Sequence, residues 1–175
     1  MSGKKILDVT DVEMKRTLEV NTLAHLYTIR EFMPAMIAAN KGHIVSICSV
    51  AGLFPSAGLA DYTASKFGAF AIDEALRLEI KKMNYNIQTT CICPYFINTG
   101  MFEGVKGRWP LRILDQHWVV WRIITAIRQN EKFVMMPFFF YLALVLRSIA
   151  PVPFGDILTH YMSGHSMDKF VGRRG

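Results

Sequence analysis

Two short apolar runs on either side of a long helical pattern constrain the fold of this chain most strongly. His43–Cys48 and Ile87–Cys93 each have the character of a buried strand, and apolar residues recur at helical spacing from about Tyr62 to Lys82 between them. A strand-helix-strand unit of this kind is expected to be parallel with a right-handed crossover. Ligands bind at the carboxyl ends of the strands in such sheets. Ser49 and Pro94 occupy those ends, so the sequence predicts an α/β fold with a site at this edge.

The other elements follow from local signals. Thr10-Asp11-Val12-Glu13 has the form of a capping box, so a helix is expected to begin there and to end at Asn40-Lys41-Gly42. A second helix is predicted over Leu114–Arg128. The stretch Phe102–Pro110 contains Gly, Lys and Arg and is predicted to be a loop on the substrate side of the site.

An uncharged run, Phe133–Leu146, has two interpretations. It is fourteen residues long and Pro137 interrupts it, whereas a helix needs about 20 residues to span a membrane. In the first interpretation, Lys132–Met136 is a last core strand and Phe138–Leu146 is a packing helix. In the second, the aromatic surface dips into a membrane interface. Both can be partly true.

The composition excludes several classes of protein. The 175 residues are 51% hydrophobic, which is enough for a core, and the net charge of +6 comes from paired basic residues without a long run, so nucleic-acid binding has little support. Cys48, Cys91 and Cys93 lie in apparent strands without Cys-x-x-Cys spacing and the His residues are scattered, so we expect reduced thiols and no metal site. Met1–Lys5 has no apolar segment, so no signal peptide is expected.

Tyr62 and Lys66 are the strongest candidates for chemistry. They are four residues apart and share a helix face. A neighbouring ammonium lowers the pKa of a phenol, which would make Tyr62 a general acid or base. Ser49 lies thirteen residues before Tyr62 and could donate to a substrate carbonyl oxygen. Simpler interpretations stay open: Ser49 as a helix cap, Tyr62 and Lys66 as surface residues, and Asn21 as a helical amide satisfied by backbone groups.

Together these residues resemble a known family. Asn21, Ser49, Tyr62 and Lys66, with the loop Pro94–Thr99, look like the catalytic tetrad and nicotinamide-side loop of the classical short-chain dehydrogenase/reductases. Pro94-Tyr95 with Thr99-Gly100-Met101-Phe102 is similar to the retinol dehydrogenase and 17-beta-hydroxysteroid dehydrogenase-like family 16C, which includes the epidermal retinol dehydrogenases. Most classical members carry Gly where Tyr95 stands.

The resemblance implies roles for the tetrad. Tyr62 would be the proton donor or acceptor, and Ser49 would bind and orient the substrate oxygen. Lys66 would hold the nicotinamide ribose and tune Tyr62, while Asn21 would support a proton-relay water. These four residues are the predicted catalytic set.

The implied cofactor is NAD or NADP, with Lys66, Tyr62, Pro94 and Thr99 as its contacts and Thr99 facing the carboxamide. A dinucleotide fold of this type begins with a Gly-rich turn that cradles the pyrophosphate, and the twelve glycines include no such motif. The expected fold is therefore the C-terminal portion of a doubly wound, Rossmann-like parallel sheet, beginning near the middle of the family's fold. We divide it into a catalytic part, 1–131, and an apolar, membrane-associating segment, 132–175.

The implied function is interconversion of a hydrophobic alcohol and carbonyl, of retinoid or steroid-like type, by an NAD(P)-dependent oxidoreductase. The alternative is a catalytically inactive, truncated relative that acts as a partner- or membrane-binding module. Implied partners are the hydrophobic substrate, a second family member in a homo- or heterodimer, and a membrane or lipid-droplet surface. The implied location is the cytoplasmic face of the endoplasmic reticulum membrane or of lipid droplets, and otherwise the cytoplasm.

Overall fold

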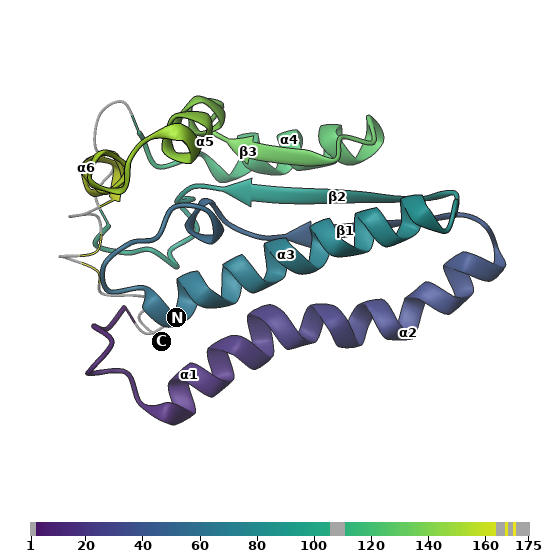
Figure 1. The fold of residues 1–175 in the computed structure, drawn as a ribbon, viewed down its shortest axis with the longest axis horizontal. Coiled ribbons are helices and arrows are strands. Elements are labelled where there is room, and N and C mark those ends of the chain that lie inside the picture. Colours follow the sequence, from purple (N-terminus) through teal and green to yellow (C-terminus); the bar gives the residue numbers. More distant parts are fainter. Residues whose placement is uncertain (1–2, 106–110, 164–166, 168–169, 171–175) are drawn as a thin grey trace.

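A three-stranded parallel sheet lies at the centre of the computed structural model, which describes residues 3–105, 111–163, 167 and 170 (Figure 1). The strand order is β1 (Gly42–Ile47), β2 (Ile87–Pro94) and β3 (Phe133–Met136). Both neighbouring pairs are parallel. All three strands therefore end at the same edge, as the sequence predicted for the first two.

The helices cover both faces of the sheet. They are α1 (Asp11–Leu18), the π-helical turn η1 (Glu19–Leu23), α2 (Ala24–Ala38), the 3-10 turn η2 (Val50–Gly52), α3 (Ala60–Lys82), α4 (Gln116–Arg128), α5 (Phe139–Ile149) and α6 (Val152–Ser163). Side chains alternate along β2, so Cys91 and Cys93 face α3 while Ile92 faces α4. Helix α3 packs on one face, with α2 beside it, and α4 packs on the other.

The predicted elements are present with small shifts at their ends. Thr10 caps α1 through the predicted capping box with Glu13. Helix α2 continues through Pro34, and the chain turns at Asn40 with a φ of 44°. The long helix begins two residues earlier than predicted, at Ala60. Helix α6 was not predicted. Part of the predicted loop Phe102–Pro110 and the final residues of the chain lie outside the described residues.

The apolar run after residue 132 forms a strand and a helix that share the core with residues 1–131. Phe140 and Ala143 of α5 are each 1% exposed and belong to the cluster that contains Tyr62, Cys48 and Met162. This confirms a packing role for one face of the run. Within the described residues, no helix is both long and apolar enough to cross a membrane.

A buried carboxyl group on α3 gives the first testable prediction. Asp73 is 1% exposed, its Oδ1 has no hydrogen-bond partner, and burial raises its pKa from 3.8 to about 6. Between these two values the folded protein holds a proton that the unfolded chain has released. The free energy of unfolding therefore falls as pH rises from about 4 to 6, by about 2 to 3 kcal/mol.

Asp73→Asn is accordingly expected to raise the free energy of unfolding by about 1 to 3 kcal/mol at pH 8 and to leave it unchanged near pH 3.5. Urea denaturation at both values measures this difference. The matched control is Glu79→Gln, an exposed carboxylate on the same helix. Equal responses of the two variants would contradict the assignment.

Candidate active site

A pocket of about 470 Å³, partly open to solvent, lies at the carboxyl edge of the sheet. Its lining residues include Ser49, which follows β1, and Tyr95, which follows β2. Phe140, just beyond β3, and Tyr62 on the first turn of α3 also line it. The pocket thus lies where the parallel strands predicted a site.

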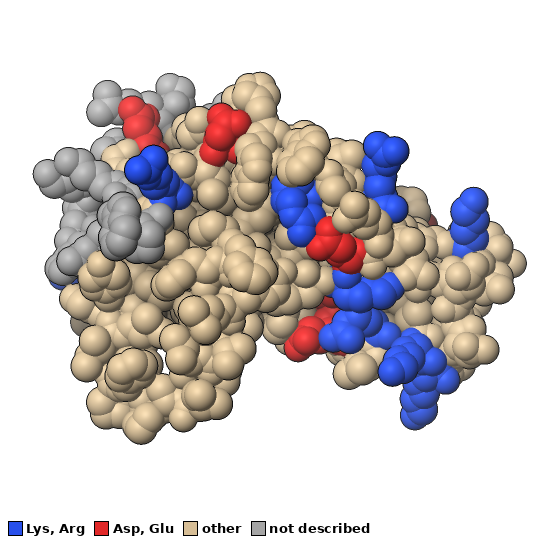
Figure 2. Space-filling model, turned by 90° about the horizontal axis from the view of Figure 1, so that it is seen from above, with Lys and Arg blue, Asp and Glu red and all other residues tan. Residues whose placement is uncertain are grey.

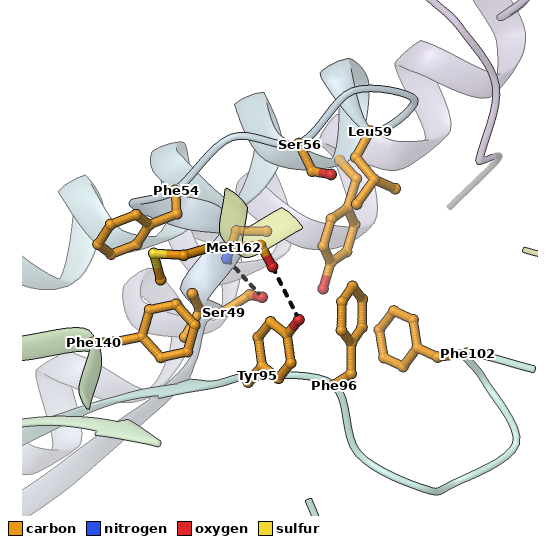
Figure 3. Close-up of a pocket in the computed structure, with 12 residues that line it drawn as sticks. Ser49, Phe54, Ser56, Leu59, Tyr95, Phe96, Phe102, Phe140 and Met162 are labelled. Carbon is orange, nitrogen blue, oxygen red and sulfur yellow. Dashed lines mark hydrogen bonds between the residues drawn. The ribbon is translucent and has the colours of Figure 1, made fainter. Parts of the chain in front are cut away.

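One wall of the pocket is a row of aromatic rings (Figure 3). The ring centroids of Phe140 and Tyr95 are 5.3 Å apart, those of Tyr95 and Phe96 4.6 Å, and those of Phe96 and Phe102 4.8 Å. Leu59, Phe54 and Met162 contribute further apolar surface. Such a lining favours a hydrophobic ligand and leaves few groups that can bind its oxygen.

Ser49 is one of these few polar groups. It precedes η2, and its Oγ accepts a hydrogen bond from the Ala51 amide at 3.1 Å. The simpler interpretation of Ser49 as a cap is therefore confirmed. The same side chain lines the pocket and hydrogen-bonds with the Tyr62 phenol, so capping fixes the hydroxyl beside Tyr62.

Tyr62 is 7% exposed, and the dominant effect on it is desolvation. Burial raises the pKa of its phenol, and the hydrogen bond with Ser49 opposes this only in part. The prediction that Lys66 lowers the pKa of Tyr62 is therefore wrong for this structure. The phenol stays protonated at neutral pH, which suits it to donate a proton to a carbonyl oxygen.

Lys66 lies one helical turn after Tyr62, with Nζ 5.9 Å from the centre of the Tyr62 ring. Its Nζ donates to the Ile47 carbonyl oxygen at 3.0 Å, which anchors it to the end of β1. Burial lowers the pKa of Lys66, while the neighbouring thiols of Cys48 and Cys93 raise it. The Lys66 ammonium is therefore bound to the end of β1, and burial determines the direction in which the pKa of Tyr62 shifts.

Asn21 lies in the π-helical turn η1, a type of irregularity that is frequent at functional sites. Its Nδ2 donates to Ser65 Oγ at 3.1 Å, and Ser65 Oγ donates to the Tyr62 carbonyl oxygen at 2.7 Å. The Asn21 amide nitrogen thus donates to a side-chain hydroxyl and not to a backbone group. Gly68 permits this contact between helices, because a Cβ there would lie 2.6 Å from Thr22 Cγ2.

Pro94 and Thr99 bracket the loop that follows β2. Pro94 is buried and pairs in register with Met136 of β3. Thr99 is exposed, and its amide donates to the Ile97 carbonyl oxygen at 2.8 Å. Both lie at the carboxyl edge, but neither is among the residues that line the apolar pocket.

The turn that carries Ser49 packs tightly on α3, which gives a second prediction. A Cβ at Gly52 would lie 2.7 Å from the Lys66 carbonyl oxygen and 2.9 Å from its carbon, and both are backbone atoms that cannot rotate away. Gly52→Ala is expected to lower the free energy of unfolding by about 1 to 3 kcal/mol. Urea denaturation measures the loss.

Gly155→Ala is the control for this variant. Gly155 lies in α6, and the nearest atom to a Cβ there is 3.8 Å away, at ordinary van der Waals distance. In a helix, Ala is about 1 kcal/mol more favourable than Gly, so this variant is expected to be at least as stable as the parent. Equal changes in the free energy of unfolding for the two variants would contradict the tight packing of η2 on α3.

The sequence did not identify several residues that shape the site. Tyr95 Oη donates to the Met162 carbonyl oxygen at 3.4 Å and so joins the end of β2 to α6. Desolvation raises the pKa of Tyr95 to about 12. Phe54 and Phe102 come from loops, and no local pattern marks them as pocket residues. Only the aromatic character of Tyr95-Phe96 next to a strand end was a signal in the sequence.

The residues present fit one end of a nicotinamide dinucleotide. The buried Tyr62 phenol lies near the Lys66 ammonium at the end of β1, and the exposed Thr99 follows β2 at the same edge of the sheet. A Gly-rich turn that would cradle the pyrophosphate is not part of the 175-residue sequence. The chain can therefore supply the nicotinamide side of such a site.

Comparisons with known proteins point the same way. Residues 1–108 match the protein family described as short chain dehydrogenase. The chain is 42% identical to epidermal retinol dehydrogenase 2 of Mus musculus over 99% of its own length and 58% of that protein. It is 40% identical to short-chain dehydrogenase/reductase family 16C member 6 of Bos taurus, covering 56% of it. It is 36% identical to retinol dehydrogenase 10-B of Danio rerio, covering 50%.

Solved structures share the fold. A short-chain dehydrogenase from Burkholderia cenocepacia in complex with NADP matches with a TM-score of 0.74 and 21% identity, over 89% of this chain and 63% of that one. An enzyme from Burkholderia phymatum in complex with NAD matches with a TM-score of 0.70 and 18% identity, over 83% and 60%. The chain thus spans between about half and three fifths of its curated relatives. By sequence and by fold, it belongs to the short-chain dehydrogenase/reductase family of oxidoreductases.

Proposed function

We propose that this chain carries the catalytic and substrate-binding part of an NAD(P)-dependent oxidoreductase that interconverts a hydrophobic alcohol and its carbonyl. The observation that carries the proposal is that Ser49 and Tyr62 line the same aromatic pocket. Their two hydroxyl groups, in a mostly apolar lining that also includes Ser56 and Tyr95, can bind one oxygen of an apolar ligand. The names of the relatives favour a retinoid, and a steroid-like substrate is of the same chemical class.

In the reductive direction Tyr62 supplies the proton. Its raised pKa keeps the phenol neutral, so its O–H donates to the carbonyl oxygen while Ser49 holds that oxygen by a second hydrogen bond. A reduced nicotinamide bound beside the pocket would supply the hydride. After the alcohol leaves, Tyr62 regains its proton from solvent, a step in which Asn21 would hold a relay water. In the oxidative direction Tyr62 must first lose its proton to solvent, and its phenolate then accepts the hydroxyl proton of the alcohol.

The proposed cofactor contacts are Lys66 and Tyr62 at the ribose, with Pro94 and Thr99 at the nicotinamide. Lys66 Nζ already lies at the end of β1, held by the Ile47 carbonyl oxygen. A ribose hydroxyl that accepted a hydrogen bond from this ammonium would bring the ring close to Tyr62.

Titration calorimetry with NADH and NADPH on the purified chain tests the proposal. Lys66→Ala is expected to weaken binding by at least about tenfold, because a charge-assisted hydrogen bond contributes about 1.5 to 3 kcal/mol. Lys82→Ala is the matched control, since Lys82 is an exposed lysine at the far end of the same helix. A folded chain that bound neither nucleotide, or that lost binding equally in both variants, would contradict an autonomous cofactor site.

A specific observation favours a second role, as a membrane-binding module. Phe138, Leu142, Val145 and Ile149 follow one another at helical spacing along α5 and are 56–80% exposed. Helix α5 is thus apolar on its buried face and on its outer face. Val152, Phe154 and Ile157 continue this exposed surface onto α6, which we call the α5–α6 face.

The charge distribution agrees with this second role. Figure 2 looks onto the side of the molecule that carries α4, α5 and α6, and a broad area without Lys, Arg, Asp or Glu lies toward the end where Figure 1 places α6. Exposed apolar side chains that gather on one surface mark an interaction site. We propose that it rests on the surface of the endoplasmic reticulum membrane or of a lipid droplet, in keeping with the family resemblance.

Flotation with phosphatidylcholine vesicles tests this role. The double variant Leu142→Glu/Ile149→Glu is expected to abolish co-flotation, while Leu78→Glu/Met83→Glu, which places two charges on exposed apolar positions at the end of α3, should float as the parent does. If the α3 variant lost flotation instead, the apolar surface of α2 and α3 would be the docking surface.

A further inference from the structure

Three cysteine side chains converge in the core cluster that also contains Tyr62. The Sγ atoms of Cys48, Cys91 and Cys93 all lie within 4.8 Å of one another, and those of Cys91 and Cys93 are 3.8 Å apart. The three residues are buried, with exposed fractions of 3% or less. They are the only cysteines in the sequence.

The sheet is responsible for this convergence. Cys91 and Cys93 are two residues apart on β2, so both point to the α3 face. Ile47 pairs in register with Ile92, and the Cys48 amide then donates to the Ile92 carbonyl oxygen at 2.8 Å. Cys48 thus continues the line of β1 and brings its sulfur next to those of β2. The spacing in the sequence gave no sign of this cluster.

The geometry of the cluster fits one soft metal ion. Zinc-to-thiolate bonds are about 2.3 Å long, so three thiolates around one such ion are about 3.8 to 4.0 Å apart. One pair of sulfurs already has this separation, and the limit of 4.8 Å leaves an adjustment of less than about 1 Å for the others. Small side-chain rotations can supply it. Thiolates are the ligands that soft ions prefer.

The charges around the cluster favour a divalent ion over a monovalent one. A divalent ion with three thiolates carries a net charge of −1, and a monovalent ion would carry −2. The Lys66 side chain interacts electrostatically with all three cysteines, and its Nζ is held at the end of β1 by the carbonyl oxygen of the residue before Cys48. The Lys66 ammonium offsets one negative charge, so a divalent ion leaves less uncompensated buried charge than a monovalent ion would.

We propose that Cys48, Cys91 and Cys93 form a three-thiolate site for a thiophilic divalent cation, of the class of Cd²⁺ and Zn²⁺. On binding, the three S–H groups release three protons to solvent and three metal–sulfur bonds form, without oxidation or reduction. The site is independent of hydride transfer.

Titration of the purified, phosphine-reduced full chain with Cd²⁺ tests the proposal. The ultraviolet charge-transfer band of cadmium–thiolate bonds is expected to saturate at one equivalent, and X-ray absorption at that point is expected to show three sulfur neighbours. Because the chain contains no other cysteine, any such band reports this cluster. Two or fewer sulfur neighbours, no saturation at one equivalent, or a band that appears only in denaturant would overturn the proposal.

Single substitutions give the second measurement. Cys48→Ser, Cys91→Ser and Cys93→Ser are each expected to weaken Cd²⁺ binding by at least about 100-fold, because even residues that only support a metal ligand cost 10- to 100-fold. The control is Ile92→Val, which alters an equally buried position on the other face of β2. Affinity retained in any one serine variant that keeps the parent circular dichroism would overturn a three-ligand site. If the serine variants do not fold, the absorption measurement on the parent decides.

Discussion

Turnover of a hydrophobic aldehyde with NADH or NADPH is expected to fall by about 10² to 10⁴-fold when Tyr62 is replaced by Phe. The substitution keeps the buried ring and removes only the hydroxyl that hydrogen-bonds with Ser49. Because burial keeps this phenol protonated, it fits the proposed role of proton donor, which Phe cannot fill. Consumption of the reduced nucleotide, followed by its absorbance, measures the loss in kcat.

The pocket offers a matched control in Tyr95→Phe. Tyr95 also lines the pocket and its pKa is also raised by burial, but its hydroxyl donates to the Met162 carbonyl oxygen. We expect this variant to keep kcat within about tenfold of the parent, since it loses one long hydrogen bond. Equal rates for the parent and the Tyr62 variant, or equal losses in both variants, would remove Tyr62 from the mechanism.

The pH dependence of the rate of reduction tests the role of Tyr62 independently. A proton donor must be protonated, so the rate of reduction should stay constant through neutral pH and fall only as pH rises through the raised pKa of Tyr62. This value lies above the ordinary phenol value of 10.0. If the rate fell already between pH 7 and 9, Lys66 would lower the pKa of the phenol in the complex with cofactor, as the sequence suggested.

Replacing Phe140 by Ala is expected to lower the free energy of unfolding by about 3 to 5 kcal/mol. Its side chain is 1% exposed, and its ring lies 5.3 Å from the centres of both Phe54 and Tyr95. Truncation leaves a cavity between the loop after β1, the end of β2 and α5, and these segments cannot all close it. Urea denaturation of the chain in mild detergent measures the change.

Phe138→Ala is the control for this prediction. Phe138 lies two residues earlier and is 80% exposed, so its removal should change the free energy of unfolding by no more than about 0.5 kcal/mol. The same variant should weaken vesicle binding if the α5–α6 face rests on a membrane. A membrane-buried run would give the opposite pattern, in which both substitutions affect vesicle binding and neither affects folding in solution.

Local patterns predicted most of the secondary structure. The capping box at Thr10, the strand around His43–Cys48 and the long helix to Lys82 were each present within one or two residues of their predicted ends. Helix α6 was missed, because Pro151-Val152-Pro153 interrupts the apolar pattern and a proline near a helix start gives only a weak signal. The packing interpretation of the apolar run is confirmed by the buried Phe140, while the membrane interpretation stays a prediction that the exposed Phe138 permits.

The sequence by itself determined the parallel α/β order and the placement of Ser49 and Pro94 at the carboxyl edge, because strand and helix periods are written in the order of apolar residues. It also determined the family. Only the tertiary structure decided the pKa of Tyr62 and the meeting of the three cysteines. Desolvation depends on which segments cover a side chain, and the cysteine cluster depends on strand register. Desolvation and the cluster both depend on residues that are distant in the chain, so no local sequence pattern predicts them.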